Sequence, residues 1–164
     1  MRVKTERQNG NKRKAQPQQA NACFFTLGYQ KKTARSLLHA LRINGVQVLI
    51  DVRQNPVSRK PGFSKRALET GLSKAGIEYL HIPTLGTPPF IRNYFSRTGN
   101  IEHTLERYGA YISSRVYRLE YLLNVVTSRT YCLLCLESDP KSCHRSVLAE
   151  KLEKLTKCQV IHLQ

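Results

Sequence analysis

The chain has 164 residues, of which 40% are hydrophobic, and this is enough apolar surface for the core of one ordinary domain. No apolar stretch reaches the roughly 20 residues that cross a bilayer, and the N-terminal residues are too polar for a signal peptide. The five cysteines form an odd, unevenly spaced set, which argues against a disulfide framework. We therefore expect a soluble, cytoplasmic protein with free thiols and no membrane contact.

The net charge is strongly positive, because 27 Lys and Arg residues face 11 Asp and Glu residues and give +16 at pH 7. Residues 1–20 hold six of the basic residues, one glutamate and almost no apolar side chains. This composition predicts a basic, disordered tail over residues 1–21, ahead of a single domain over residues 22–164. The tail carries +5, so the domain keeps +11 (+16 less +5). Such a charge suits phosphate polyanions and predicts nucleic acid or a nucleotide as partner.

Strands and helices alternate along the first half of the predicted domain. Three apolar runs predict strands over residues 23–27, 46–52 and 77–82. Two stretches with apolar residues three and four apart predict helices that begin after the capping residues Thr33 and Ser64. Each of these helices is followed by glycine, which is typical of a helix end.

The second half begins with a stretch that reads as a long loop. Residues 83–100 contain three prolines, two glycines and three aromatic residues, and a loop of this length in a compact domain is usually functional or disordered. Residues 101–126 have helical spacing, with Gly109 as the point where the helix could break. The remaining predicted elements are a strand over residues 131–136, a helix ending near Thr156 and a strand over residues 159–163.

This alternation predicts an α/β fold: a single three-layer domain with a mostly parallel sheet of about five strands, flanked by helices on both faces. In such sheets, ligands bind beyond the carboxyl ends of the strands. Polar residues follow four of the predicted strands, so we expect a site on that rim.

The candidate site residues fall into two groups. Glu137 directly follows a buried strand, and burial raises the pKa of a carboxyl group, as suits acid–base catalysis. The last helix should begin near His144, and the free N–H groups of a helix start favour anions. The candidates for catalysis are Glu137, His144, Asp51 and Cys143. The candidates for binding substrate or phosphate are Arg145, Arg53, Ser146, Tyr29 and His81.

Several candidates also have a structural interpretation. Asp51 could simply pair with Arg53, and His81 could be a core histidine that bonds a backbone carbonyl. A helix start next to His144 would lower the pKa of the Cys143 thiol, but the same residue could only pack the turn.

The Cys132-x-x-Cys135 spacing has the form of a redox or zinc pair, but both residues fall inside a predicted strand. Residues three apart in a strand point to opposite faces and cannot close on one metal ion. We therefore interpret both cysteines as core residues and predict neither a metal site nor a cofactor.

Seven ordered motifs stand at residues 26–29 (TLGY), 49–58 (LIDVRQNPVS), 62–64 (GFS), 76–81 (GIEYLH), 85–86 (LG), 135–140 (CLESDP) and 143–146 (CHRS). Together they resemble one uncharacterised bacterial and archaeal family, known as domain of unknown function 488. The resemblance extends from Phe24 to Leu163 and implies a compact α/β fold with a site drawn from the same motifs, but no reaction.

A weaker resemblance links two segments to rhodanese domains. Residues 49–53 (LIDVR) and 145–149 (RSVLA) are similar to the segments that flank the rhodanese cysteine loop. In that family cysteine directly follows the strand and arginine comes about six residues later. Here Lys141 stands six residues after Cys135, so the cysteine loop is not reproduced.

The main interpretation is therefore an enzyme that acts on a nucleotide or nucleic acid through the strand-end rim, for example a phosphodiester or N-glycosidic hydrolase. The first alternative is a non-catalytic module that binds phosphate or nucleic acid with the same residues. A rhodanese-like thiol enzyme is the second alternative.

Overall fold

The computed structural model describes residues 24–115, 117, 120 and 129–164. The tail predicted over residues 1–21 lies outside the described residues. So does most of the predicted helix beyond residue 115.

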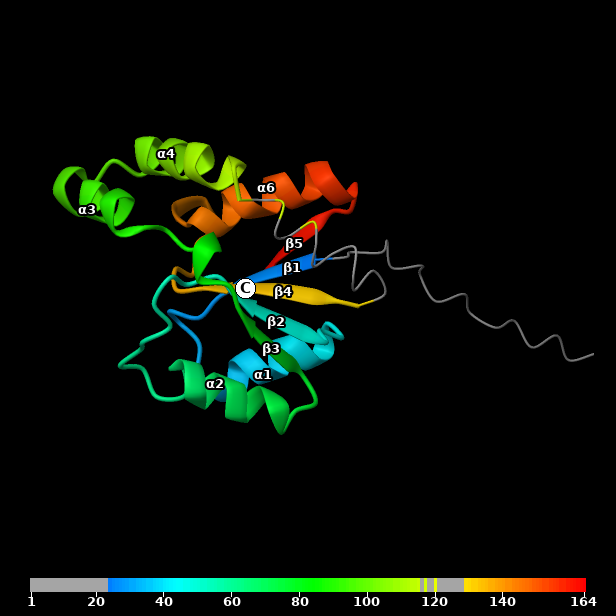
Figure 1. The fold of residues 1–164 in the computed structure, drawn as a ribbon. Coiled ribbons are helices and arrows are strands. Elements are labelled where there is room, and N and C mark those ends of the chain that lie inside the picture. Colours follow the sequence, from blue (N-terminus) through cyan, green and yellow to red (C-terminus); the bar gives the residue numbers. More distant parts are fainter. Residues whose placement is uncertain (1–23, 116, 118–119, 121–128) are drawn as a thin grey trace, which may run out of the picture.

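Five parallel strands form one sheet, in the order β3-β2-β4-β1-β5 (Figure 1). This confirms the α/β fold and the parallel sheet predicted from the alternation of elements. The strands β1 to β5 span Phe24–Gly28, Val48–Asp51, Glu78–His81, Tyr131–Cys135 and Val160–Leu163.

Helices cover both faces of this sheet (Figure 1). Helices α1 (Ala34–Ile43) and α2 (Lys65–Ser73) pack on one face. Helices α3 (Pro89–Thr98), α4 (Ile101–Ser113) and α6 (His144–Thr156) lie on the other. No helix among the described residues has both the length and the apolar character needed to cross a bilayer.

The long loop predicted over residues 83–100 is largely helical. It contains the 3-10 helix η1 (Pro83–Leu85) and the whole of α3. Pro89 occupies the first turn of α3, where proline costs no hydrogen bond, and Gly99 ends the helix with φ of +63°. The prolines and the glycine thus mark the two ends of a helix. Helix α4 also continues through Gly109 without the break that the sequence suggested.

Two apolar cores lie on opposite faces of the sheet, and β4 contributes to both. Cys132 faces the core under α1 and α2, whereas Cys135 faces the core under α4 and α6. The prediction that these two cysteines point to opposite faces is confirmed. Cys132, Cys135 and Cys143 have free thiols, but Cys158 is disulfide-bonded, so the expectation of free thiols is wrong for that residue.

Candidate functional site

The connections that leave the sheet diverge around the carboxyl end of β4. The chain leaves β1 and β2 toward α1 and α2 on one face, but it leaves β4 toward α6 on the other. In parallel sheets such a divergence opens a crevice at the strand ends. A pocket of about 690 Å³ lies at this point, lined by residues from the ends of β1, β2 and β4 and by α3 and α4.

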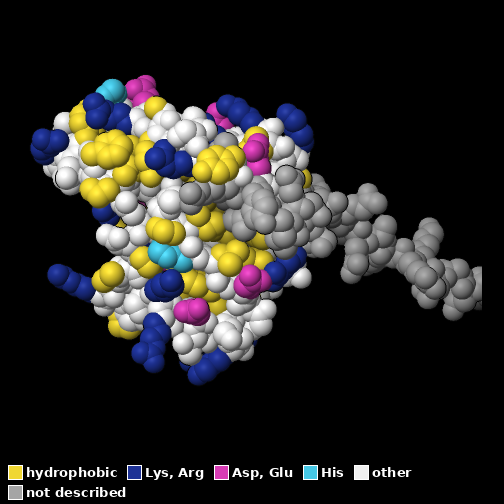
Figure 2. Space-filling model, viewed as in Figure 1, with side chains coloured by type: hydrophobic (Ala, Val, Ile, Leu, Met, Phe, Trp, Pro, Cys, Tyr) yellow, Lys and Arg dark blue, Asp and Glu magenta, His cyan; other side chains and the backbone are white. Residues whose placement is uncertain are grey.

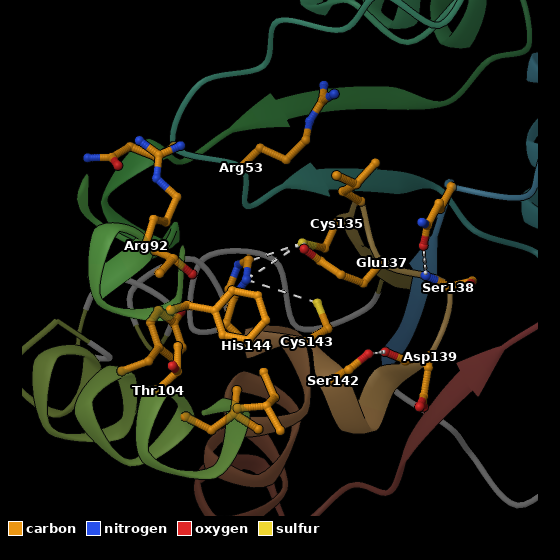
Figure 3. A pocket seen from close by; sticks show the side chains of 18 of the residues that line it. Arg53, Arg92, Thr104, Cys135, Glu137, Ser138, Asp139, Ser142, Cys143 and His144 are labelled. Carbon is orange, nitrogen blue, oxygen red and sulfur yellow. Dashed lines mark hydrogen bonds between the residues drawn. The ribbon is translucent and has the colours of Figure 1, made fainter. Parts of the chain in front are cut away.

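One wall of the pocket is apolar and comes from α3 and α4. The lining residues are Phe95, Ile101, Leu105 and Tyr108, and Phe95 is 42% exposed. Apolar side chains gather over this part of the surface, with Lys and Arg side chains around them (Figure 2). Arg92 of α3 is exposed and lines the same pocket (Figure 3). The wall therefore offers an aromatic surface next to a guanidinium group.

The pocket is also lined by four side chains whose ligand atoms lie within 4.8 Å of one another, namely Cys135, Glu137, Cys143 and His144, here called the β4 cluster. The thiol of Cys135 donates to Oε2 of Glu137 at 3.0 Å and lies 3.6 Å from Nδ1 of His144. The sulfur of Cys143 is 4.0 Å from the same Nδ1. The four side chains converge on one point (Figure 3).

The β4 cluster is held in place by the buried side chain of Arg145. Its guanidinium donates to the backbone carbonyls of Glu137 and of Ser138, the latter at 2.7 Å. The loop after β4 can approach this closely because Gly28 has no Cβ, and a Cβ there would lie 1.7 Å from the carbonyl oxygen of Glu137. Arg145 therefore fixes the path of the loop that carries Glu137.

Neighbouring groups also fix the two residues at the start of α6. The backbone N–H of Arg145 donates to the sulfur of Cys143 at 3.5 Å, so Cys143 serves as the N-cap of the helix. The ring of Tyr108 meets the His144 ring edge-on, with centroids 4.9 Å apart. Tyr108 is fully buried and its hydroxyl donates to the carbonyl of Leu85, which orients the tyrosine.

The β4 cluster perturbs the acidity of its own members. Burial raises the pKa of Glu137, and the nearby Cys143 raises it further. Burial alone would also raise the pKa of the Cys143 thiol, but hydrogen bonds from Cys135 and His144 outweigh it and hold that pKa well below its usual value. The same contact with Cys143 raises the pKa of Cys135 well above its usual value. These shifts favour the thiolate of Cys143 and disfavour the charged forms of Cys135 and Glu137.

Asp51 and Arg53 lie at the end of β2 but form a buried network of their own. Asp51 is fully buried, and its carboxylate accepts from Nε and Nη2 of Arg53 at 2.8 and 2.5 Å and from the hydroxyl of Tyr79 at 2.7 Å. Arg53 also donates to the hydroxyl of Tyr29 and to the carbonyl of Phe63. These partners occupy the polar groups that catalysis or phosphate binding would need.

The remaining predicted binding residues have structural contacts. The ring of His81 bonds the carbonyl of Arg53 at 2.9 Å, and the hydroxyl of Ser146 donates to the carbonyl of Cys143. Arg53 lines the pocket, but its guanidinium points away from the β4 cluster (Figure 3). Of the nine candidates, the structure brings together Glu137, Cys143 and His144.

The pocket residues that the sequence reasoning missed include Cys135, Arg92 and Phe95. Cys135 is a buried strand residue as predicted, but it occupies the last position of β4 and its thiol joins the cluster. Arg92 fell in the stretch that was predicted to be a loop. A signal for Cys135 exists in the sequence, because Cys135 and Glu137 stand two apart at a strand end and can therefore point the same way.

The fold and the site define an α/β protein with a parallel sheet and a strand-end pocket lined by thiol, carboxylate and imidazole groups. The family model "Domain of unknown function DUF488" matches residues 33–152, so the chain belongs to this family. Searches of curated proteins and of solved structures found no match.

Proposed function

We propose that the protein is an enzyme that cleaves a bond in a phosphate-containing nucleotide or nucleic acid, with the pocket at the end of β4 as its active site. The observation that carries this proposal is the pairing of two unlike walls in one pocket. The exposed residues Phe95 and Arg92 line the same pocket as the β4 cluster.

The first wall suits the two parts of a nucleotide. The exposed ring of Phe95 offers a face on which a base can stack, an interaction worth about 1–3 kcal/mol per base. Arg92, three residues earlier on α3, offers a guanidinium to phosphate oxygens. The positive net charge of the chain would raise the local concentration of such a ligand.

The second wall supplies the groups that a bond cleavage needs. Imidazole and carboxyl groups that lie together in a partly buried pocket are suited to hold and move protons or to position a water molecule. Glu137 and His144 are both half-buried and both line the pocket, so a bound substrate could reach them. Asp51, by contrast, has no exposed surface.

The test is a turnover screen with nucleosides, nucleotides and oligonucleotides, in which product is measured by chromatography. Glu137→Gln should lower kcat by about 100-fold or more, as loss of a proton-transfer group does. The matched control is Glu150→Gln, a carboxyl group on the exposed side of α6 away from the pocket, and it should retain full turnover.

Two results would contradict the proposal. Binding of nucleotides without turnover would show that the protein is a non-catalytic binding module. Equal turnover by the wild type and Glu137→Gln would place the reaction outside the β4 cluster. Phe95→Ala separates the roles of the two walls, because it should raise KM more than it lowers kcat.

A further inference from the structure

We infer that the β4 cluster is a binding site for one divalent transition-metal ion of the Zn²⁺ class. This goes beyond the proposed function, because metal binding needs no nucleotide and can be measured without one. The inference rests on the kind, the spacing and the support of the four donor groups.

The donor set is the one that such ions prefer. Two thiol sulfurs, one imidazole nitrogen and one carboxylate oxygen make four ligands, the coordination number of zinc sites in proteins. Sulfur and nitrogen donors favour Zn²⁺, Co²⁺ and similar ions over Mg²⁺ and Ca²⁺, which take oxygen donors. The chemistry of the set therefore points to the class of metal.

The spacing of the donors also fits one ion. With bonds of 2.0–2.3 Å, the ligands of a tetrahedral site lie about 3.3–3.8 Å apart. The sulfur of Cys135 is 3.0 Å from Glu137 Oε2 and 3.6 Å from His144 Nδ1. The sulfur of Cys143 is 4.0 Å from the same nitrogen, and all four donor atoms lie within 4.8 Å of one another. Small side-chain movements would bring them all to bonding distance.

The surroundings hold the donors in this arrangement, as outer partners do in metal sites. The buried guanidinium of Arg145 donates to the backbone carbonyls of Glu137 and Ser138 and so anchors the loop after β4. The backbone N–H of Arg145 points to the sulfur of Cys143, and the buried ring of Tyr108 packs against the ring of His144. Cys135 itself is fixed by the parallel pairing of β4 with β1, where it lies opposite Gly28.

A metal ion here would also act where a substrate can reach it. The β4 cluster lines the same pocket as Phe95 and Arg92. A bound ion could polarise a phosphate oxygen or lower the pKa of a water molecule, two effects by which metals assist hydrolysis. Only this catalytic role rests on the proposed function.

The experiment titrates the full-length protein, reduced and freed of metal, with Co²⁺ and then with Zn²⁺. We expect one Co²⁺ per chain, with the intense visible bands of a tetrahedral site and a near-ultraviolet band from thiolate-to-cobalt charge transfer. Zn²⁺ should displace the Co²⁺, bleach both sets of bands and raise Tm.

The variants assign the ligands. Cys135→Ala and Cys143→Ala should each weaken the charge-transfer band and lower Co²⁺ affinity by about 100-fold or more, since loss of an outer partner alone costs 10–100-fold. The matched control is Cys132→Ala, which removes the free thiol that faces the opposite core, and it should keep the spectrum. His144→Gln, at a half-buried position, gives a second test should the buried cysteine variants fail to fold.

Three outcomes would overturn the inference. These are an absence of the cobalt bands in the wild type, unchanged bands in both Cys135→Ala and His144→Gln, and a Cys135–Cys143 disulfide that forms even with metal in excess. Metal binding without nucleotide turnover would retain the site and reject the proposed function. Turnover that survives metal removal would support the proposed enzymatic activity and reject a catalytic role for the ion.

Discussion

At the scale of single residues, the same chemical groups serve two purposes at neighbouring strand ends. Asp51 ends β2 and Glu137 comes two residues after β4, yet Asp51 has all its lone pairs directed to protein partners, whereas Glu137 lines a pocket. Burial and partner count therefore mark Asp51 as a structural carboxylate, whereas Glu137 stays accessible from the pocket.

Asp51 should therefore matter for stability. Asp51→Ala would leave the buried guanidinium of Arg53 without its charge partner, which costs about 3–5 kcal/mol of unfolding free energy. Urea unfolding followed by circular dichroism measures the loss. Glu150→Ala breaks the exposed pair with Lys154 and should change stability by less than about 1 kcal/mol. A cost for Asp51→Ala as small as that of the control would mean that the buried pair is not needed for the fold.

At the scale of elements, the β4 cluster depends on how closely β1 and the loop after β4 can approach. Gly28 at the end of β1 lies against the carbonyl of Glu137, in a space that no side chain could share. The Arg145 guanidinium fills the space next to it, so a Cβ at Gly28 would also lie 2.9 Å from that side chain. The strand end, the loop and the start of α6 are therefore packed against one another without free space.

Gly28→Ala should destabilise the protein and disturb the site. The backbone must shift to admit the Cβ, and overpacking of this kind costs about 1–3 kcal/mol or more. The change should also displace Glu137, and so weaken Co²⁺ binding in any fraction that folds. Gly71→Ala is the matched control, because Gly71 is inside α2 with open space around its Cβ position, and it should raise stability by about 0.5–1 kcal/mol. Similar effects of the two substitutions would contradict the close approach.

The sequence was most informative where local rules decide the structure. Thr33 forms a capping box with Ser36, and the apolar runs became parallel strands close to their predicted bounds. The sequence analysis failed where a signal has two meanings, as Pro88 and Pro89 do, because proline favours both a loop and the first turn of a helix.

For the candidate site, the sequence analysis found three of the four β4 cluster members. The sequence analysis assigned Arg145 to phosphate binding, but in the structure its guanidinium donates to backbone carbonyls. Only the folded chain shows where such a long side chain points.

At the scale of the whole molecule, the charge of the chain has a measurable consequence. The +16 net charge belongs to the full sequence, and Lys and Arg side chains are spread over the visible face (Figure 2). The exposed arginines Arg92, Arg97 and Arg107 lie on α3 and α4, and Arg92 lines the pocket. Such a surface would attract phosphate groups.

We therefore predict nucleic-acid binding that is sensitive to salt and largely independent of sequence. If about six phosphates are neutralised, affinity should fall by about 10³-fold between roughly 50 and 200 mM salt, because each neutralised phosphate releases bound counterions. Fluorescence anisotropy with labelled oligonucleotides at several salt concentrations measures the slope of log K against log salt. Deleting residues 1–20, which carry +5, should make this slope shallower, and Arg92→Gln should reduce it by about one. Phe95→Ala changes no charge, so it should weaken binding to single strands but leave the salt slope unchanged. A protein that binds no oligonucleotide even at low salt would reject nucleic acid as a partner.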